Sequence, residues 1–210
     1  MFLALVSGFL FDTFEDPLLA INQTNALPPV SFDAYLVPPT IQSFTLNMDT
    51  GVLLLWFSEE LVQVSLDPTS LTLQSEKNAN PAYTFNLTDG IVGVGTSPNI
   101  LAIELVKADL DTIKSMEYLA FSTNSTFLRA LAPIGIDPAR NQVDSIASVD
   151  ALIATMVFAD IVNPDLESFT LNMSSGLLSL LFSEPIRASS LKPSQISIYA
   201  GQDADRRYTL

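Results

Sequence analysis

The stretch SFTLNMDTGVLLLWFSE at residues 43–59 decides the fold. In its first six residues apolar and polar side chains alternate, with Phe44, Leu46 and Met48 on one face. A period of two is typical of a strand with one face on a core. Gly51 follows as a turn residue. Residues 52–57 are almost all apolar, which predicts a central strand, buried from both sides or lying in the middle of a sheet.

This stretch occurs twice. SFTLNM at residues 43–48 returns at residues 168–173, and sliding the chain by 125 residues makes 18 of 43 positions identical between 43–85 and 168–210. The same offset works backwards, pairing Asp12 with Asp137 and Ile21 with Ile146. Internal repetition at a fixed period is the signature of a repeat architecture. We therefore expect Phe44 and Phe169 to have equivalent surroundings.

The repeat register divides the chain into three parts. Residues 1–37 are predicted to be the C-terminal part of a preceding repeat, 38–162 a complete repeat, and 163–210 the N-terminal part of a following repeat. Prolines mark both boundaries, at Pro38-Pro39 and at Pro164, where a missing N–H group stops a sheet from continuing. The apolar N-terminus MFLALVSGFLF could also be a signal peptide, but it lacks a basic region, and its match to residues 126–136 favours a domain interior.

Within one repeat, further short strands are predicted, separated by Asn, Asp, Gly and Pro. Many short strands with such turns favour a sandwich. One segment, ADLDTIKSMEYL at residues 108–119, carries apolar residues at helical spacing, with Asp109 or Asp111 placed to cap the first turn. It predicts one short helix. The strand segments predicted in this region are residues 71–73, 83–87, 91–94, 100–105, 126–136 and 151–162.

Composition limits the function. The net charge is −14 and the pI about 4.1, so nucleic acid and anionic membrane surfaces are poor partners. The chain has no Cys and no His, which excludes disulfides and removes the commonest general base and metal ligand. No apolar run reaches the roughly 18 residues needed to span a bilayer. We therefore expect no membrane insertion, no enzyme activity and no cofactor.

Four segments together resemble a known family. They are residues 43–59, residues 65–74, the DLDTIKSM helix, and DPARN at residues 137–141. They are similar to the bacterial-type immunoglobulin-like (Ig-like) tandem repeats of secreted and surface proteins. The resemblance implies an all-β fold of tandem Ig-like β-sandwich domains with one short helix per repeat, located outside the cell. In the family the last motif reads Asp-x-x-Gly-Asn. Arg140 replaces the Gly here, which puts a turn with positive φ in doubt.

Few residues suggest a specific site. Glycosylation sequons occur at Asn22, Asn86, Asn124 and Asn172, and N-linked glycans are a possible modification at them. Trp56 is predicted to pack in the core rather than to bind sugar. The acidic residues have no calcium-loop spacing, so no metal site is predicted and a solvated edge or turn is favoured. These residues are Glu59-Glu60, Glu184, Asp12, Glu15 and Asp16.

Two functions remain open. The first is a structural protein of an extracellular filament, stalk or surface array, in which copies of the chain associate head to tail, with strand complementation between subunits as one mode of joining. The second is an adhesin or a module that binds a glycan or a protein through its loops. Sparse aromatic residues in the predicted loops favour the first.

Overall fold

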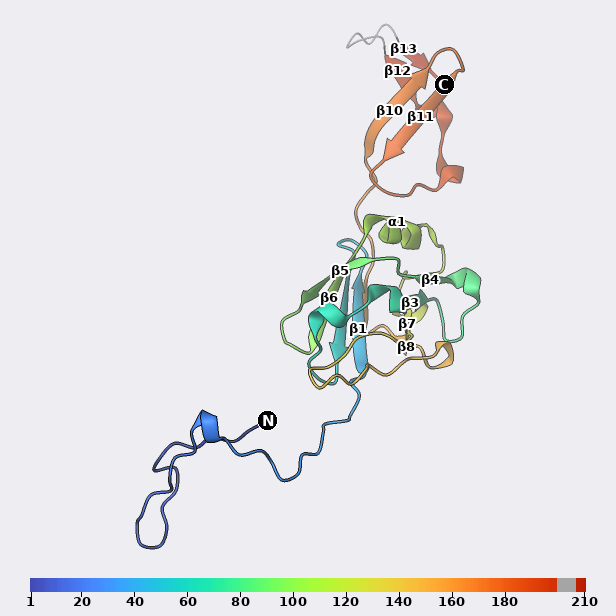
Figure 1. Cartoon of the computed structure of the whole chain (residues 1–210). Helices are drawn as coiled ribbons and strands as arrows, with labels where there is room; N and C mark the ends of the chain where they lie inside the picture. The colour runs from blue at the N-terminus through green and yellow to red at the C-terminus, as the bar shows by residue number, and fades with distance from the viewer. Residues whose placement is uncertain (200–206) are drawn as a thin grey trace. The chain divides into compact units, whose positions relative to one another are not determined.

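The computed structural model describes residues 1–199 and 207–210 (Figure 1). The chain forms two compact units, residues 1–36 and residues 37–210. In the described residues the regular structure is mostly β, with one α-helix, α1 (Lys107–Ser115). The chain is therefore mostly β, as predicted from the alternating pattern.

The larger sheet holds the strands predicted from residues 43–59. Its order is β5-β6-β2-β1-β9, and all neighbours are antiparallel except β1 and β9, which are parallel. Strand β2 lies in the middle of the sheet, as predicted. Its burial alternates, however, so it is covered on one face only. The strands are β1 (Ile41–Asn47), β2 (Val52–Phe57), β5 (Gly90–Val94), β6 (Ile100–Leu105) and β9 (Met156–Phe158).

A second sheet covers the apolar face of the first. Its order is β4-β3-β7-β8, all antiparallel. Side chains from both sheets and from α1 form one core, which includes Phe44, Leu55, Leu73, Ile113 and Leu128, each with an exposed fraction of 0%. Two sheets that bury their inner faces against each other are the basis of a β-sandwich. The strands are β3 (Leu71–Gln74), β4 (Thr84–Asn86), β7 (Phe127–Ala130) and β8 (Leu152–Ile153).

The turn between β1 and β2 depends on an asparagine and a glycine. Oδ1 of Asn47 accepts hydrogen bonds from the backbone N–H groups of Asp49 (2.9 Å) and Thr50 (3.1 Å), an Asx turn. Gly51 has a φ of +68°, and a Cβ there would meet Leu110 at 3.1 Å. Both the backbone conformation and the packing therefore require glycine.

Helix α1 is not capped as predicted. Neither Asp109 nor Asp111 caps its N-terminus, because the N-cap position is Val106, which provides no side-chain cap. Asp109 is instead buried and accepts hydrogen bonds from the backbone N–H and the hydroxyl of Thr88. Asp111 pairs with Lys107 one turn earlier. Asp109 thus connects α1 to Thr88, and Asp111 forms an ion pair within the helix. Neither carboxylate caps the N-terminus of the helix.

Trp56 does not lie in the core. It alternates with the buried residues Leu55 and Phe57 along β2 and is only half-buried. The prediction of core packing was wrong because a strand that is apolar throughout was read as buried on both faces.

Residues 166–182 repeat the β1–β2 hairpin of the central repeat. Strands β10 (Leu166–Asn172) and β11 (Leu177–Phe182) pair in the register of β1 and β2 shifted by 125 residues, including the irregularity after the first pair. Oδ1 of Asn172 accepts from Ser174 and Ser175 as Oδ1 of Asn47 accepts from its turn. Strands β12 (Ser197–Tyr199) and β13 (Arg207–Thr209) follow as an antiparallel pair.

The surroundings of Phe44 and Phe169 differ in burial. Phe44 is fully buried, whereas Phe169 has an exposed fraction of 58%. Both occupy the same place in the same hairpin, opposite Leu55 and Leu180 respectively. The expectation of equal surroundings therefore holds for the backbone and fails for packing, because no second sheet covers β10 and β11 in the described residues.

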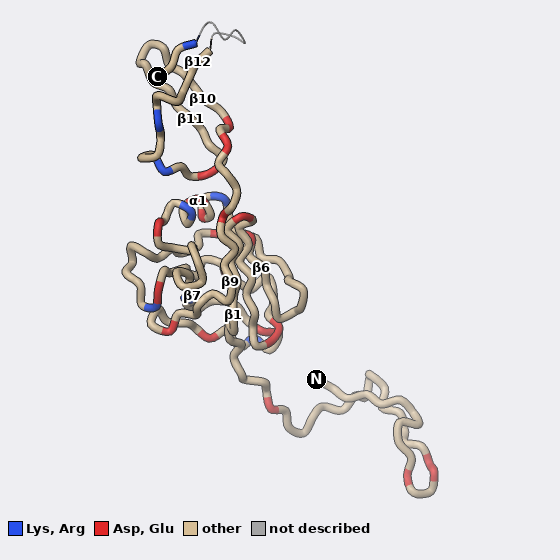
Figure 2. The backbone as a smooth tube through the Cα atoms, turned by 180° about the vertical axis from the view of Figure 1, so that it is seen from behind, with Lys and Arg blue, Asp and Glu red and all other residues tan. Residues whose placement is uncertain are grey.

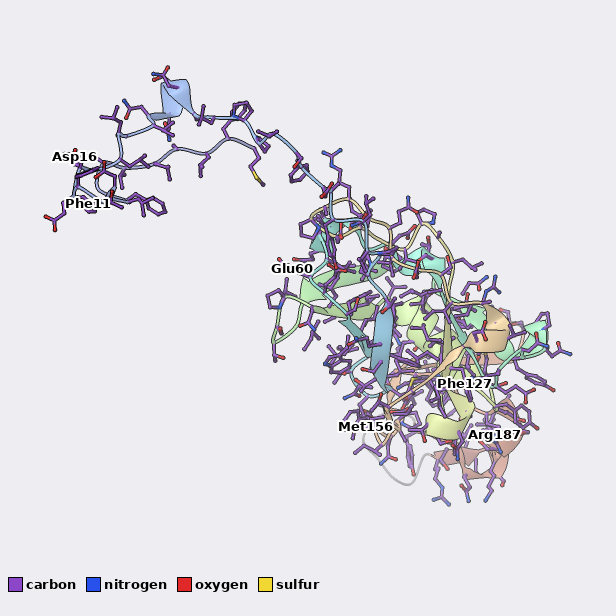
Figure 3. All side chains as sticks on the ribbon, turned by 90° about the horizontal axis from the view of Figure 1, so that it is seen from below. Phe11, Asp16, Glu60, Phe127, Met156 and Arg187 are labelled. Carbon is purple, nitrogen blue, oxygen red and sulfur yellow. The ribbon has the colours of Figure 1, made fainter. Side chains whose placement is uncertain are left out.

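Residues 1–36 repeat the structure that follows β7. Their antiparallel bridges Leu3–Leu27, Leu5–Ile21 and Phe11–Pro17 match pairs at an offset of 125 residues. Those pairs are Leu128–Leu152, Ala130–Ile146 and Ile136–Gln142. Figure 3 shows the side chains of Phe11 and Asp16 together at a turn of this unit, and most of its large apolar side chains are exposed.

Short 3-10 turns also recur at this offset, as η2 with η7, η3 with η8, and η1 with η6. The 3-10 turns are η1 (Gln23–Asn25), η2 (Gln63–Ser65), η3 (Pro68–Ser70), η4 (Pro81–Tyr83), η5 (Thr123–Ser125), η6 (Ser148–Asp150), η7 (Ala188–Ser190) and η8 (Pro193–Gln195).

The turn placed in doubt by Arg140 is present. Arg140 has a φ of 73°, and its equivalent Glu15 has a φ of 67°. The buried carboxylate of Asp137 holds the turn by accepting the N–H of Asn141 at 2.7 Å. Hydrogen bonding thus supports a conformation that a side chain disfavours, at roughly 1 to 3 kcal/mol of strain.

We predict that Arg140→Gly stabilises the protein by about 1 kcal/mol, since glycine removes this strain and loses only part of the gain to unfolded-state entropy. Arg140 is exposed, so its side chain leaves no cavity. The measurement is the midpoint of urea unfolding. The matched control, Arg129→Gly within β7, should destabilise. If both variants were equally destabilised, the backbone of Arg140 would not be strained.

Candidate functional site

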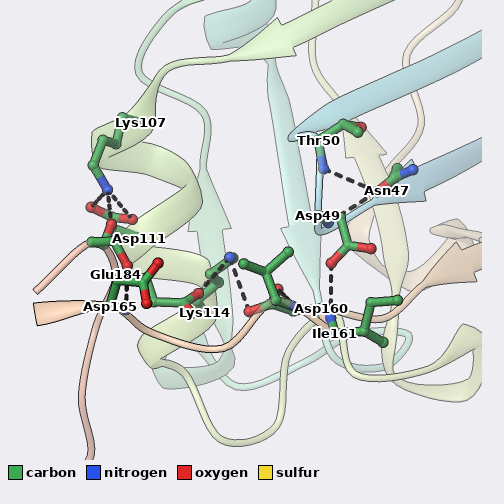
Figure 4. A network of polar contacts seen from close by, with 12 residues as sticks. Asn47, Asp49, Thr50, Lys107, Asp111, Lys114, Asp160, Ile161, Asp165 and Glu184 are labelled. Atoms are coloured by element: carbon green, nitrogen blue, oxygen red, sulfur yellow. Dashed lines mark hydrogen bonds and ion pairs between the residues drawn. The ribbon is translucent and has the colours of Figure 1, made fainter.

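A group of charged side chains joins the central repeat to residues 163–210. Nζ of Lys114 lies 2.9 Å from Oδ2 of Asp160 and 2.8 Å from Oε2 of Glu184 (Figure 4). The exposed fractions of the three side chains are 12%, 27% and 11%. Contacts this short between partly buried ionised groups are stronger than surface ion pairs. We call Lys114, Asp160 and Glu184 the junction triad.

Each member is positioned by a different element. Lys114 lies in the last turn of α1, where the helix dipole favours a cation. Asp160 follows β9, whose parallel pairing with β1 fixes where the chain leaves the sheet. Glu184 follows β11 in the second copy of the Phe-Ser-Glu motif. The triad therefore connects the helix, the end of one repeat and the first hairpin of the next.

Two further contacts cross the same junction. Nζ of Lys107 donates to the backbone carbonyl of Ser183 at 2.7 Å while it pairs with Asp111. Oδ1 of Asp49, in the β1–β2 turn, accepts the N–H of Ile161 at 2.8 Å. Together with the triad, these bonds hold the connecting segment at several points. The connection is therefore braced and does not rely on its prolines alone.

Burial and charge act in opposite directions on the triad. Desolvation favours neutral Lys114, but its hydrogen bonds and Coulombic attraction to Glu184 and Asp160 outweigh it and raise the pKa of Lys114 above 10.5. Desolvation also favours protonated Asp160, yet the hydrogen bonds from its neighbours and the charge of Lys114 lower the pKa of Asp160 below 3.8. Both groups are thus ionised at neutral pH.

The triad is incompletely satisfied. Oε1 of Glu184 is buried and accepts no hydrogen bond from the described residues. A buried acceptor without a partner reduces the net gain from the ion pair. The free energy that the triad contributes to the junction is therefore smaller than its two short contacts suggest.

The other acidic residues singled out in the sequence have local roles. Oδ1 of Asp12 accepts the backbone N–H groups of Phe14 (2.8 Å) and Asp16 (3.0 Å), which forms a turn. Glu60 is exposed on the central repeat, and its neighbour Glu59 is partly buried (Figure 3). No group of three or more potential metal ligands occurs among the residues that the structure describes.

The four sequon asparagines are all exposed. Oδ1 of Asn86 accepts the hydroxyl of Thr72 at 2.7 Å, and Asn172 caps its turn as described above. Asn22 precedes η1 and Asn124 lies within η5. The structure brings none of them together into a single site.

An aromatic cluster was missed in the sequence. The rings of Tyr83 and Tyr118 meet edge to face with centroids 5.5 Å apart and an interplanar angle of 80°. Both are more than 40% exposed, as is nearby Phe121 at 78%. An open hollow next to them is lined by Tyr118, Phe121 and Ile186. No periodic pattern indicates the cluster, because Tyr83 comes from η4 and Tyr118 from the loop after α1.

Comparison with known proteins gives no family. No known family matches the sequence, and no curated protein matches it. Among solved structures, the chain is similar to the S-layer protein rSbsC, at 12% identity over 65% of this chain and 15% of that one, with a TM-score of 0.37.

It is also similar to domains 1–6 of the surface layer protein SbsC, at 8% identity over 69% of this chain and 18% of that one, with the same TM-score. The chain spans less than a fifth of either structure. In the described residues no helix is long and apolar enough to cross a membrane.

We predict that acid loosens the junction. Because the pKa of Asp160 is lower in the folded protein, its contribution is complete above the ordinary value of 3.8 and is lost as the pH falls through the folded value. The measurement is energy transfer between dyes on Lys77→Cys and Ser175→Cys, which are unique thiols in a chain without Cys. The distribution of transfer efficiencies should be narrow at pH 7 and should broaden below pH 3.8, while the fluorescence of Trp56 still reports a folded core.

Two variants control this measurement. Lys114→Met leaves Glu184 without its partner, and the loss of about 1.5 to 3 kcal/mol should broaden the population already at pH 7. Lys192→Met removes an exposed lysine that makes none of the junction contacts described above and should behave like the parent. A narrow population in Lys114→Met at pH 7 would show that the triad does not hold the junction.

Proposed function

We propose that this chain is a structural protein of an extracellular filament, stalk or surface array, built from head-to-tail Ig-like β-sandwich repeats. The observation that carries the proposal is the recurrence, at one offset of 125 residues, of strand register, turn hydrogen bonds and positive-φ residues. Equal backbone structure at equal spacing is what an array of one domain type requires.

The proposal divides the chain as the sequence does, into residues 1–37, 38–162 and 163–210. The central part has its own core, and the flanking parts have the backbone of its second and first halves. An array role is supported by the junction as well. A contact between the helix end of one repeat and the first hairpin of the next is heterologous, so it propagates in one direction.

An extracellular structural role also suits the composition. The chain is acidic, and it has neither His nor Cys to serve as catalytic base or nucleophile. We propose no enzyme activity and no cofactor. Glycans on Asn22, Asn86, Asn124 and Asn172 are part of the proposal, since all four side chains are exposed.

The function is tested in the source cells. Gold-labelled antibody against the central repeat should bind intact cells, and negative-stain microscopy of the released material should show rods or filaments with a regular axial period. Enzymatic removal of N-glycans followed by intact mass measurement tests the sequons on the same material. Label found only after permeabilisation, on globular particles, would refute the surface array.

A second function, adhesion, is favoured by the aromatic cluster. Exposed tyrosine rings present flat apolar faces with polar edges, which suit the recognition of sugars or of a protein partner. The edge-to-face pair of Tyr83 and Tyr118 fixes one such face beside Phe121. The pair occurs in the complete repeat, so it would recur along an array only where these residues recur.

We predict that, if the chain is an adhesin, Tyr118→Ala lowers affinity for a ligand found on a glycan array about tenfold, the equivalent of ~1.4 kcal/mol. Tyr199→Ala is the matched control, because Tyr199 is also exposed but lies in β12 outside the cluster. Equal affinity of both variants would exclude the cluster as the binding site.

A further inference from the structure

Two segments of this chain have the backbone of the halves that pack together in the central repeat, and their apolar faces are exposed in the described residues. In the central repeat, β3 pairs with β7, and β1 pairs with β9. Residues 196–199 repeat β3, and residues 2–5 repeat the start of β7. Residues of these segments that correspond to core residues of the central repeat are exposed. Leu3, for example, is 56% exposed, whereas its equivalent Leu128 is 0% exposed. The central repeat shows which segment would cover each face.

We propose that residues 1–36 of one copy add to residues 163–210 of a second copy, in the register of the central repeat. The inference rests on the proposed function and names its joining contact. In the smaller sheet, Leu73 faces Leu128 and Thr72 faces Arg129, so Ile198 meets Leu3 and Ser197 meets Ala4 of the other copy. The main chain supplies affinity in such strand addition, and alternate side chains supply specificity.

The larger sheet gains a strand in the same way. Leu46 faces Val157 in the parallel pair of β1 and β9, so Leu171 meets Phe32 of the other copy. Leu171 is 39% exposed and Phe32 63% exposed. Both are apolar residues at the places where the central repeat buries its inner face.

The connections between the sheets fit the same register. In the central repeat, the N–H of Val62 donates to the carbonyl of Ile136 at 2.9 Å, and the N–H of Asp67 donates to that of Ile134 at 2.8 Å. The equivalent pairs are Arg187 with Phe11 and Lys192 with Phe9. Arg187, Lys192 and Phe11 lie in local structure that matches the central repeat, whereas Phe9 follows a turn at Gly8, which has a φ of 78°, and must rearrange to pair.

Charge also favours this partner. Residues 1–36 contain four acidic residues and no basic one, and residues 187–210 contain four basic and two acidic residues. Figure 2 shows acidic positions and no basic position on residues 1–36. The register brings Arg187 beside the turn at Asp12. Residues 163–210 as a whole contain four basic and five acidic residues, so the opposite charge is confined to residues 187–210, where it favours this contact over the pairing of like segments.

Within residues 1–36 and the described part of residues 163–210, the composite sandwich joins the equivalents of β1, β2, β3, β7 and β9, which are fewer strands than the central repeat has. We expect its association to be weaker than folding of the central repeat, reversible, and dependent on protein concentration.

The test is a disulfide in a chain that has none. Antiparallel partners lie about 4.5 to 5.5 Å apart between Cα atoms, within the span of a disulfide. Ala4→Cys combined with Ser197→Cys should give, on mild oxidation, a ladder of multimers on a non-reducing gel. Mixing isotopically labelled and unlabelled copies identifies the joined peptides as coming from two molecules.

Matched variants test register and face. Thr72→Cys with Arg129→Cys should close within one chain, and Ala4→Cys with Tyr199→Cys, two residues out of register, should give no ladder. Leu3→Asp should abolish association in sedimentation velocity, whereas Ala4→Asp, with the same charge on the opposite face, should retain it. A ring closed within one chain, or a monomer at all concentrations, would overturn the proposal.

These results separate the joining contact from the function. Surface rods with no ladder would reject strand addition and leave the array role standing. A ladder with protein confined to the cell interior would reject the array role alone.

Discussion

The rest of the structure depends on covering the apolar inner face of the β1–β2 hairpin. Phe44, Leu46, Leu53 and Leu55 project from it and are fully buried in the central repeat, at roughly 1.5 to 3 kcal/mol for each large side chain removed from water. The second sheet and α1 pack against that face. Where the same hairpin stands without them, at β10 and β11, the backbone is retained and Phe169 is exposed. Local hydrogen bonds thus determine the hairpin, and burial requires its partner sheet.

The junction triad has a different role, which is to hold residues 163–210 against the central repeat. Its members are charged and lie at the rim of the core. Water still reaches Asp160 there, which reduces the cost of burying the charges. Their attraction exceeds the desolvation of Lys114 and raises its pKa. A junction of this kind responds to pH and to ionic strength, whereas the apolar core does not. The connection between the central repeat and residues 163–210 can therefore loosen while the apolar core stays folded.

Much of the fold could be predicted from the alternation in SFTLNM and from the period of 125 residues. Strand β1, the central place of β2, the short helix and the recurrence of the hairpin all follow from these two patterns. Trp56 and Asp109 could not be placed, since the first depends on which face of β2 is covered and the second on a distant partner, Thr88.

The junction triad could not be predicted from the sequence either, because its ion pairs join residues 46 and 70 positions apart. Only Glu184 was singled out, and for its acidity alone. Arg140 shows the reverse case: the pattern suggested a lost turn, and the buried carboxylate of Asp137 preserves it. The parallel pairing of β1 with β9 has a mechanical consequence. Because the first and last strands of the repeat lie side by side and point the same way, tension along the chain loads their hydrogen bonds in shear, all together, and a domain of this topology resists stretching better than one that unzips bond by bond.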